Sequence, residues 1–158
     1  MTATAILARE GNPAAIAAFA RRGDECAYAN LKLMTRVLNN LYDEALRPVD
    51  LRAGQLALLW AIAAMEPVEL GKLSEVILTD QTTLSRTVAK LKKARLVNVR
   101  AGRDRRVKLV ALTPAGRCRF GEAMPLWEEA QQRAARFVSV GEVRAMARQV
   151  RKTARQRA

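Results

Sequence analysis

Hydrophobic residues recur along most of this chain at spacings of three and four, which is the pattern of helices with one buried face. The pattern changes between residues 97 and 111, where apolar and polar residues alternate as they do in half-buried strands. The residues predicted to share the apolar side of these strands are Val97, Val99, Val107, Leu109 and Ala111. The sequence therefore predicts a mainly α-helical protein of the α+β class with one hairpin. Helices are expected over residues 13–22, 24–47, 56–63, 70–77, 80–93, 114–138 and from 139 onward.

The helix over residues 24–47 carries a longer apolar seam than a single small domain needs for its core. Asp24 is expected to cap its first turn and Pro48 to stop it. The seam follows a heptad pattern, which is typical of helices that pack lengthwise, through Ala27, Leu31, Met34, Leu38, Leu41 and Ala45. This pattern favours an interface between two subunits, and packing against helices of the same chain is the alternative. The next helix has a broad apolar face that is expected to be buried, formed by Leu56, Leu59, Trp60 and Ala63.

The helix over residues 80–93 has one apolar side and one polar, basic side. Thr79 or Asp80 can cap its start, and Leu84, Val88 and Leu91 form the apolar stripe. Hydroxyl groups and a guanidinium can reach base edges in a major groove, and lysines can meet phosphates. This side therefore favours DNA binding, with an ordinary solvated helix face as the alternative. The side chains that would contact DNA are Thr82, Thr83, Ser85, Arg86, Lys90 and Lys93.

The hairpin that follows has a basic tip. Residues 101–106 read AGRDRR, a glycine-containing turn with three arginines. Because this tip directly follows a basic helix, the two can contact adjacent grooves of one duplex. A helix followed by a basic two-stranded wing is the winged helix-turn-helix arrangement, which we predict for this lobe.

The positive charge of the chain is concentrated on this same stretch. Of the net charge of +13, residues 80–112 contribute +8, with ten Lys and Arg against two Asp. A uniformly basic surface would not gather charge in this way, and binding to a polyanion is the natural interpretation. A sequence-independent architectural protein that binds DNA or RNA would also fit the charge. A further basic stripe is interpreted as a solvated helix face, although it could also contact DNA or acidic residues of a partner subunit such as Asp43 and Glu44. Its members are Arg144, Arg148, Arg151 and Arg155.

Other classes of protein are disfavoured by what the sequence lacks. There is no histidine, and the two cysteines, Cys26 and Cys118, stand far apart, so histidine triads and zinc sites are not expected. With no phosphate-binding loop either, we expect neither catalytic residues nor a metal or cofactor, and no enzymatic activity. The apolar start over residues 3–8 is too short for a signal peptide, and the longest apolar run, 56–65, is too short to span a bilayer. A cytoplasmic location is expected.

A set of short motifs occurs in a fixed order over roughly residues 24–138: a helix junction within 41–59, Asp80, TTLSR at 82–86, Leu91, Leu96-Val97, Asp104-x-Arg106 and Leu112-Thr113-x-x-Gly116. In the order and spacing of these motifs, the sequence resembles the MarR family of bacterial transcription regulators. The resemblance implies one domain over 1–158. Within it, a winged helix-turn-helix lobe would cover about 50–112, and helices over about 13–47 and 114–156 would form a dimerisation region.

The resemblance also implies roles for residues of the wing. Asp104 and Arg106 would pair with each other and shape the hairpin, Arg105 would enter the minor groove, and Arg103 would contact a phosphate. Two positions depart from the family pattern. Arg95 stands where the family usually has a glycine in the left-handed conformation, which costs up to about 1 kcal/mol if that geometry is kept. Arg52 stands where the second helix usually has a capping Ser or Thr.

Proteins of this kind are usually homodimeric repressors that bind a pseudo-palindromic operator and are released by a small aromatic or phenolic ligand, or by thiol oxidation. Tyr28, Trp60 and Met65 are the candidates to line an effector site, with ordinary core positions as the alternative. Cys26 is a weaker redox candidate, because Tyr28 occupies the place of the cysteine in the peroxide-sensing branch of the family. The expected function is that of a sequence-specific, ligand-released repressor.

Overall fold

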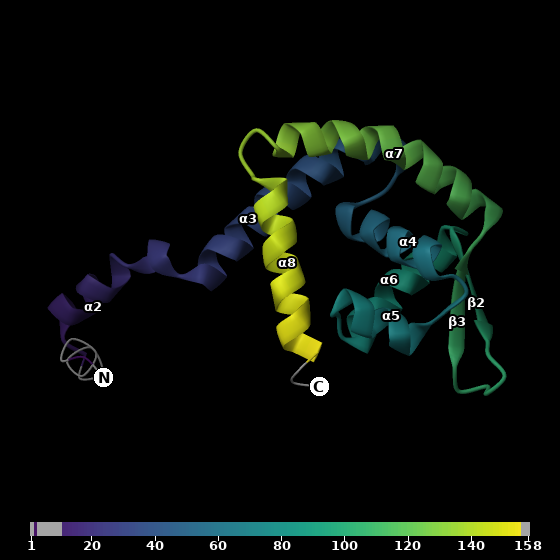
Figure 1. Ribbon diagram of the computed structural model, residues 1–158, viewed down its shortest axis with the longest axis horizontal. Helices are drawn as coiled ribbons and strands as arrows, with labels where there is room; N and C mark the ends of the chain where they lie inside the picture. The colour runs from purple at the N-terminus through teal and green to yellow at the C-terminus, as the bar shows by residue number, and fades with distance from the viewer. Residues whose placement is uncertain (1, 3–10, 156–158) are drawn as a thin grey trace. The chain divides into compact units, whose positions relative to one another are not determined.

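The computed structural model describes residue 2 and residues 11–155, with the backbone alone for residues 154 and 155. The chain divides into two compact units, residues 1–38 and 39–158. The described part is mostly helical with one small antiparallel sheet (Figure 1), so the predicted fold class is confirmed. No helix in the described part is long and apolar enough to cross a membrane. The apolar start over 3–8 and the predicted end of the last helix at 156 lie outside the described residues.

The elements follow one another with short connections. Two of them are single 3-10 turns, η1 (Gly23–Glu25) and η2 (Arg47–Val49). The strands are β1 (Val68–Glu69), β2 (Val97–Ala101) and β3 (Lys108–Leu112). The helices are α2 (Pro13–Ala20), α3 (Ala27–Ala45), α4 (Ala53–Met65), α5 (Leu70–Ile77), α6 (Gln81–Lys93), α7 (Pro114–Ala134) and α8 (Val140–Arg155).

The start of the long helix α3 differs from the prediction. Asp24 does not cap it, because residues 23–25 form the 3-10 turn η1 and α3 begins at Ala27. The backbone oxygen of Asp24 instead accepts a hydrogen bond from Asn30 Nδ2 at 2.6 Å. The first turns of α3 are exposed, including the seam residues Leu31 and Met34, which are 48% and 37% exposed. These apolar side chains are therefore free to contact another molecule.

The core of the larger unit lies between α4, α5, α6, α7 and the sheet. Its most deeply buried side chains are Leu46, Leu51, Leu59, Ile62, Leu73, Leu84, Leu91, Val97 and Val110. Helix α4 begins at Ala53 without a capping Ser or Thr before it. Asp43 Oδ1 accepts a hydrogen bond from the backbone N–H of Ala53 at 2.7 Å, and Gln55 Oε1 accepts one from that of Arg52 at 2.8 Å. These two side chains replace the missing cap, because they satisfy backbone donors that have no partner inside the helix.

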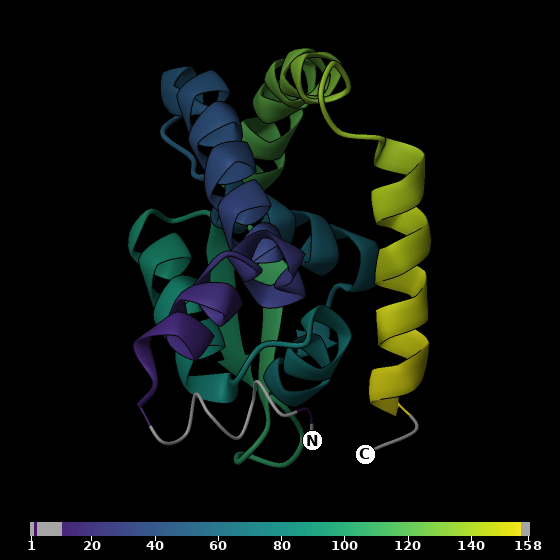
Figure 2. The ribbon, with the colours of Figure 1, turned by 90° about the vertical axis from the view of Figure 1, so that its left-hand side faces the viewer.

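The three strands pair antiparallel in the order β1-β3-β2. The loop that joins β2 and β3 lies at the bottom of the view in Figure 2. Val97 lies opposite Leu112 and Val99 opposite Val110, so these four side chains share the face that packs on the core. The predicted phase of the second strand was therefore wrong: Leu109 and Ala111 face outward, and Val107 precedes the strand. The two-residue strand β1 was not predicted, because it is too short to show alternation and forms by pairing with β3.

Helix α7 follows the hairpin directly. Thr113 caps it through its side chain, which accepts a hydrogen bond from the backbone N–H of Gly116 at 2.9 Å, and Pro114 occupies the first turn. The helix continues through Pro125 and ends at Ala134 rather than at Val138. Every side chain described in α8 is exposed.

Gly116 has no room for a larger residue. A Cβ atom added there would overlap the carbonyl oxygen of Leu96 and lie 2.9 Å from its carbonyl carbon. We expect Gly116→Ala to lower the free energy of unfolding by about 1–3 kcal/mol or more, because backbone atoms must move apart. Urea titration followed by circular dichroism measures the change.

Gly121 in the same helix provides the matched control. Nothing lies within 4 Å of a Cβ added there, so Gly121→Ala should raise the free energy of unfolding by about 0.5–1 kcal/mol. Equal effects of the two substitutions would contradict the close contact at Gly116.

Candidate nucleic-acid interface

Helix α6 is held by a capped start and a buried stripe. Asp80 Oδ1 accepts a hydrogen bond from the backbone N–H of Thr83 at 2.8 Å, and this bond holds the pKa of the Asp80 carboxyl below its ordinary value. Leu84, Val88 and Leu91 are buried, at 1%, 4% and 0% exposure, so the predicted apolar side is confirmed. Helix α5 packs against α6 and ends at Leu78, which has the left-handed φ of 52°. This turn completes a helix-turn-helix.

The opposite side of α6 is open to solvent. All six side chains selected from the sequence on this helix are exposed, namely Thr82, Thr83, Ser85, Arg86, Lys90 and Lys93. Among the described residues, none of the ion pairs involves a cation of α6. These lysines and Arg86 are therefore available to a negatively charged partner.

The exit from α6 uses the strained residue anticipated from the sequence. Arg95 has a φ of 60°, the left-handed conformation that glycine adopts most easily. Its backbone N–H donates to Lys92 O at 2.9 Å, and that of Leu96 donates to Leu91 O at 2.9 Å. The hydroxyl of Thr113 donates to Arg95 O at 2.7 Å. The turn thus fixes the point at which β2 leaves α6.

The tip of the wing is shaped by Asp104 through the main chain. Asp104 Oδ1 accepts a hydrogen bond from the backbone N–H of Arg106 at 2.9 Å, and Asp104 O accepts one from that of Val107 at 2.9 Å. The expected pairing of Asp104 with Arg106 thus runs through a backbone N–H, and no ion pair joins the two side chains in the described part of the chain. Arg103, Arg105 and Arg106 are all exposed.

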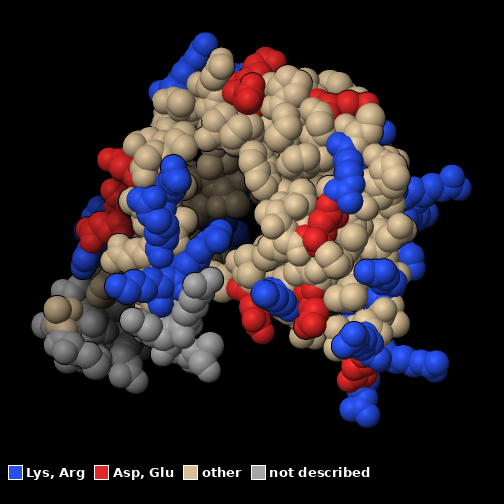
Figure 3. All heavy atoms as spheres, turned by 45° about the vertical axis from the view of Figure 1, so that its right-hand side comes forward, with Lys and Arg blue, Asp and Glu red and all other residues tan. Residues whose placement is uncertain are grey.

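A hollow of about 380 Å³ lies between α6 and the wing. Ser85, Ala89 and Lys92 line it from α6. The wing contributes three cations, Arg100, Arg105 and Lys108, and two apolar residues, Val99 and Ala101. No Asp or Glu lines this hollow. Figure 3 shows Lys and Arg side chains projecting from the surface on the side where the hairpin lies. The basic surface is therefore continuous from α6 to the wing.

Sequence reasoning missed three of these cations, Lys92, Arg100 and Lys108. Lys92 lies beside the apolar stripe of α6 rather than opposite it, so helical periodicity did not assign it to the outward face. Arg100 and Lys108 reach the hollow only because β2 pairs with β3 and packs beside α6. The alternation around Val97 and Val99 could have placed Arg100 on the exposed face of its strand.

Known proteins of the same fold include several transcription regulators. The family model of the MarR family matches residues 49–107. The transcriptional regulator MosR of M. tuberculosis, solved in complex with DNA, is 31% identical over 83% of this chain and 97% of its own, with a TM-score of 0.74. The chain belongs to the MarR family. It is accordingly a DNA-binding transcriptional regulator.

Two further solved structures have a similar fold. BpsR of Bordetella bronchiseptica, whose DNA binding is regulated by 6-hydroxynicotinic acid, is 25% identical over 84% of this chain and 95% of its own, with a TM-score of 0.70. A mutant of E. coli MarR complexed with operator DNA is 22% identical over 79% and 91% of the two chains, with a TM-score of 0.69. No curated protein matches the chain.

The residues expected to line an effector site in this MarR-family chain lie in both units. Trp60 was predicted to be buried, but it is 41% exposed, and Leu58 takes the buried position beside Leu59. The ring of Trp60 packs edge to face against the rings of Phe120 and Trp127, and the ring centroids are 5.7 and 5.0 Å apart. Trp60 therefore contacts two aromatic residues of α7 and remains partly exposed.

The other candidate residues have different surroundings. Met65 is half-buried against the core of the larger unit, and Tyr28, in the N-terminal unit, is 72% exposed. Cys26 and Cys118 are both exposed, free thiols. The structure therefore groups Trp60 with other aromatic residues and leaves Tyr28 and Cys26 on the surface of α3 and the turn before it.

Arg95 provides a test of the geometry between α6 and the wing. Because its φ of 60° favours glycine, Arg95→Gly should raise the free energy of unfolding by up to about 1 kcal/mol. The neighbouring Ala94 has a φ of −75°, so Ala94→Gly should lower the free energy of unfolding. Thermal or urea unfolding distinguishes the two, and a loss of stability in Arg95→Gly would refute the left-handed turn.

Proposed function

We propose that this protein is a homodimeric repressor that binds a pseudo-palindromic operator and releases it when a small aromatic ligand binds. The observation that carries the DNA-binding part is the exposed face of α6, which combines hydroxyls and a guanidinium. It lies beside a wing whose charged residues in the shared hollow are all cations. A purely electrostatic binder needs charge alone, whereas hydroxyl and guanidinium groups at the centre of a helix face can read base edges. The complex of the related MosR with DNA supports the proposal.

The proposed contacts follow from the position of each side chain. The N-terminal half of α6 would enter the major groove, with Thr82, Thr83, Ser85 and Arg86 at base edges. Lys90 and Lys93 lie further along the helix and would meet phosphates, as would Arg103 near the tip of the wing. Arg105 would enter the minor groove. Lys92 and Lys108, which line the hollow between α6 and the wing, would follow the DNA strand that passes between the two grooves.

The terminal helices supply the proposed dimer interface. Apolar side chains of α3 are exposed, with Leu31 at 48% and Val37 at 44%, and α8 exposes Val143 at 40% and Met146 at 52%. Exposed apolar surface of this extent on amphipathic helices marks an interaction site. A second copy of the same chain is the proposed partner, because two recognition helices are needed to read two half-sites about one helical turn apart.

An aromatic effector would act through the cluster around Trp60. BpsR shows that DNA binding by a related fold can respond to an aromatic acid. In this chain, the partly exposed ring of Trp60 offers an edge and a face to such a ligand, with Phe120 and Trp127 behind it.

A transcription regulator with these partners acts in the cytoplasm, where its DNA is.

Sequencing of genomic fragments retained by the purified protein at near-physiological salt tests the proposed specificity. A few fragments that share an inverted repeat would support a specific regulator. Uniform retention that disappears with modest added salt would instead indicate a sequence-independent binder of polyanions.

Arg86 and Lys93 should respond differently to truncation. We expect Arg86→Ala to lose about 1–3 kcal/mol of discrimination against other sequences, because a bidentate contact to a base is removed. Lys93→Ala should weaken binding to all sequences alike and lower the slope of log affinity against log salt by about 1. Fluorescence anisotropy with operator and random duplexes measures both, and equal losses on the two duplexes for Arg86→Ala would refute its role as a base reader.

Tryptophan emission reports on the proposed effector site, because the chain has two tryptophans and both lie in the same aromatic cluster. We expect 6-hydroxynicotinic acid, used as a probe, to change the emission in a saturable way over the range in which it releases operator DNA. Trp127→Phe should keep this change, whereas Trp60→Phe should lose it. Release of DNA without any change in emission would place the effector elsewhere.

A further inference from the structure

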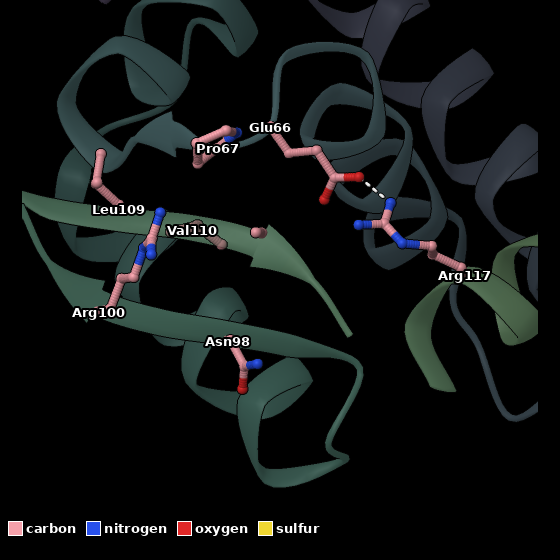
Figure 4. A pocket seen from close by; sticks show the side chains of 8 residues that line it. Glu66, Pro67, Asn98, Arg100, Leu109, Val110 and Arg117 are labelled. Atoms are coloured by element: carbon pink, nitrogen blue, oxygen red, sulfur yellow. Dashed lines mark hydrogen bonds and ion pairs between the residues drawn. The ribbon is translucent and has the colours of Figure 1, made fainter. Parts of the chain in front are cut away.

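The outer face of the wing sheet carries a second hollow, of about 470 Å³. It lies on the side of the sheet away from the core, since Asn98 pairs with Ala111 and Arg100 with Leu109 in the antiparallel register. Figure 4 shows the guanidinium of Arg100 lying across β3 toward Leu109 and Pro67. This volume falls within the range of sites for small molecules, about 300–1,000 Å³.

The hollow has an apolar floor and polar walls. Leu109 and Ala111 form the floor on β3, Asn98 and Arg100 stand along β2, and Glu66 closes the far end. Ligand sites of small molecules commonly combine an apolar surface with a few polar groups that fix orientation. The shape thus suits a small molecule with a flat apolar body and one polar end.

The charged residues that line the hollow determine which charge the polar end of a ligand should carry. Glu66 is already paired with Arg117 (Figure 4). It also accepts a hydrogen bond from the backbone N–H of Leu112 at 2.6 Å. Arg100 has no ion-pair partner among the described residues. Glu69 faces the same side across Leu109, but it does not line the hollow. The unpaired charge that faces the hollow is therefore the positive charge of Arg100.

We propose that this hollow binds a small carboxylate with an apolar body. The carboxylate pairs with the guanidinium of Arg100, whose fork of N–H donors matches two carboxylate oxygens. The side-chain amide of Asn98 donates a further hydrogen bond, and the apolar body rests on Leu109 and Ala111. The Glu66–Arg117 pair at the far end adds no net charge, so it neither attracts nor repels the ligand strongly.

The site also has a consequence for DNA binding, which rests on the proposed function. Arg100 lines both hollows, the one on the outer face and the one between α6 and the wing. A carboxylate that holds Arg100 on the outer face removes one cation from the surface offered to the DNA strand. Occupancy therefore weakens DNA binding without any contact between the ligand and the aromatic cluster around Trp60.

The binding test uses the full chain without DNA, so that its outcome does not depend on the proposed function. Benzoate serves as the probe and neutral benzamide as its uncharged counterpart, each titrated at low salt and followed by nuclear magnetic resonance of the Asn98 and Ala111 amides. We expect saturable shifts with benzoate and none with benzamide. Arg100→Gln should weaken the binding of benzoate by about tenfold or more, since a charge-assisted pair is lost.

Arg103→Gln provides the control for a general loss of positive charge, because Arg103 lies in the wing tip and does not line the hollow. It should leave the affinity for benzoate nearly unchanged, while Ala111→Trp, which fills the floor, should abolish binding. Equal losses in Arg100→Gln and Arg103→Gln, equal binding of benzamide, or no saturable shift at millimolar benzoate would each overturn the site. A benzoate-dependent loss of operator affinity in the wild type, absent in Arg100→Gln, would link the site to DNA binding.

Discussion

The contact between the first turn of α7 and the exit from α6 holds the DNA-binding lobe together. The backbone N–H of Thr113 donates to Leu96 O at 3.0 Å, and Gly116 lies against the same carbonyl group. The hydroxyl of Thr113 bonds Arg95 O while it caps α7. The end of α6, the two ends of the wing and the start of α7 therefore meet in one small region. Contacts made there by Thr113 and Gly116 connect α7 to the turn between α6 and β2.

Local patterns in the sequence were sufficient to locate the helices, although not all of their ends. The period of Leu84, Val88 and Leu91 identified both faces of α6, because helical periodicity depends on near neighbours only. Asp80, one of the two capping residues predicted for this helix, caps it. The fold class and the exposed residues of α6 could thus be predicted from the chain alone.

Features that depend on pairing between distant residues could not be predicted. Leu109, Val110, Ala111 and Leu112 are all apolar, so alternation does not define which of them face the core, and only the register with β2 decides it. The strand β1 exists only through its pairs with β3. The cations Arg100 and Lys108 join α6 in one hollow only after the sheet has formed. The turn η1 also displaced the start of α3, which Asp24 alone did not reveal.

The cations of the surface formed by α6 and the wing are all arginine and lysine, and the chain has no histidine. Lysine and arginine side chains ordinarily keep their charge to about pH 10 and beyond, and histidine is the side chain that ordinarily changes charge between about pH 5 and 8. The surface proposed to bind DNA therefore holds no histidine that could gain or lose a charge in this range. Its attraction for DNA varies instead with the concentration of ions, so osmotic changes in a cell would alter occupancy of the operator, whereas mild acidification would not.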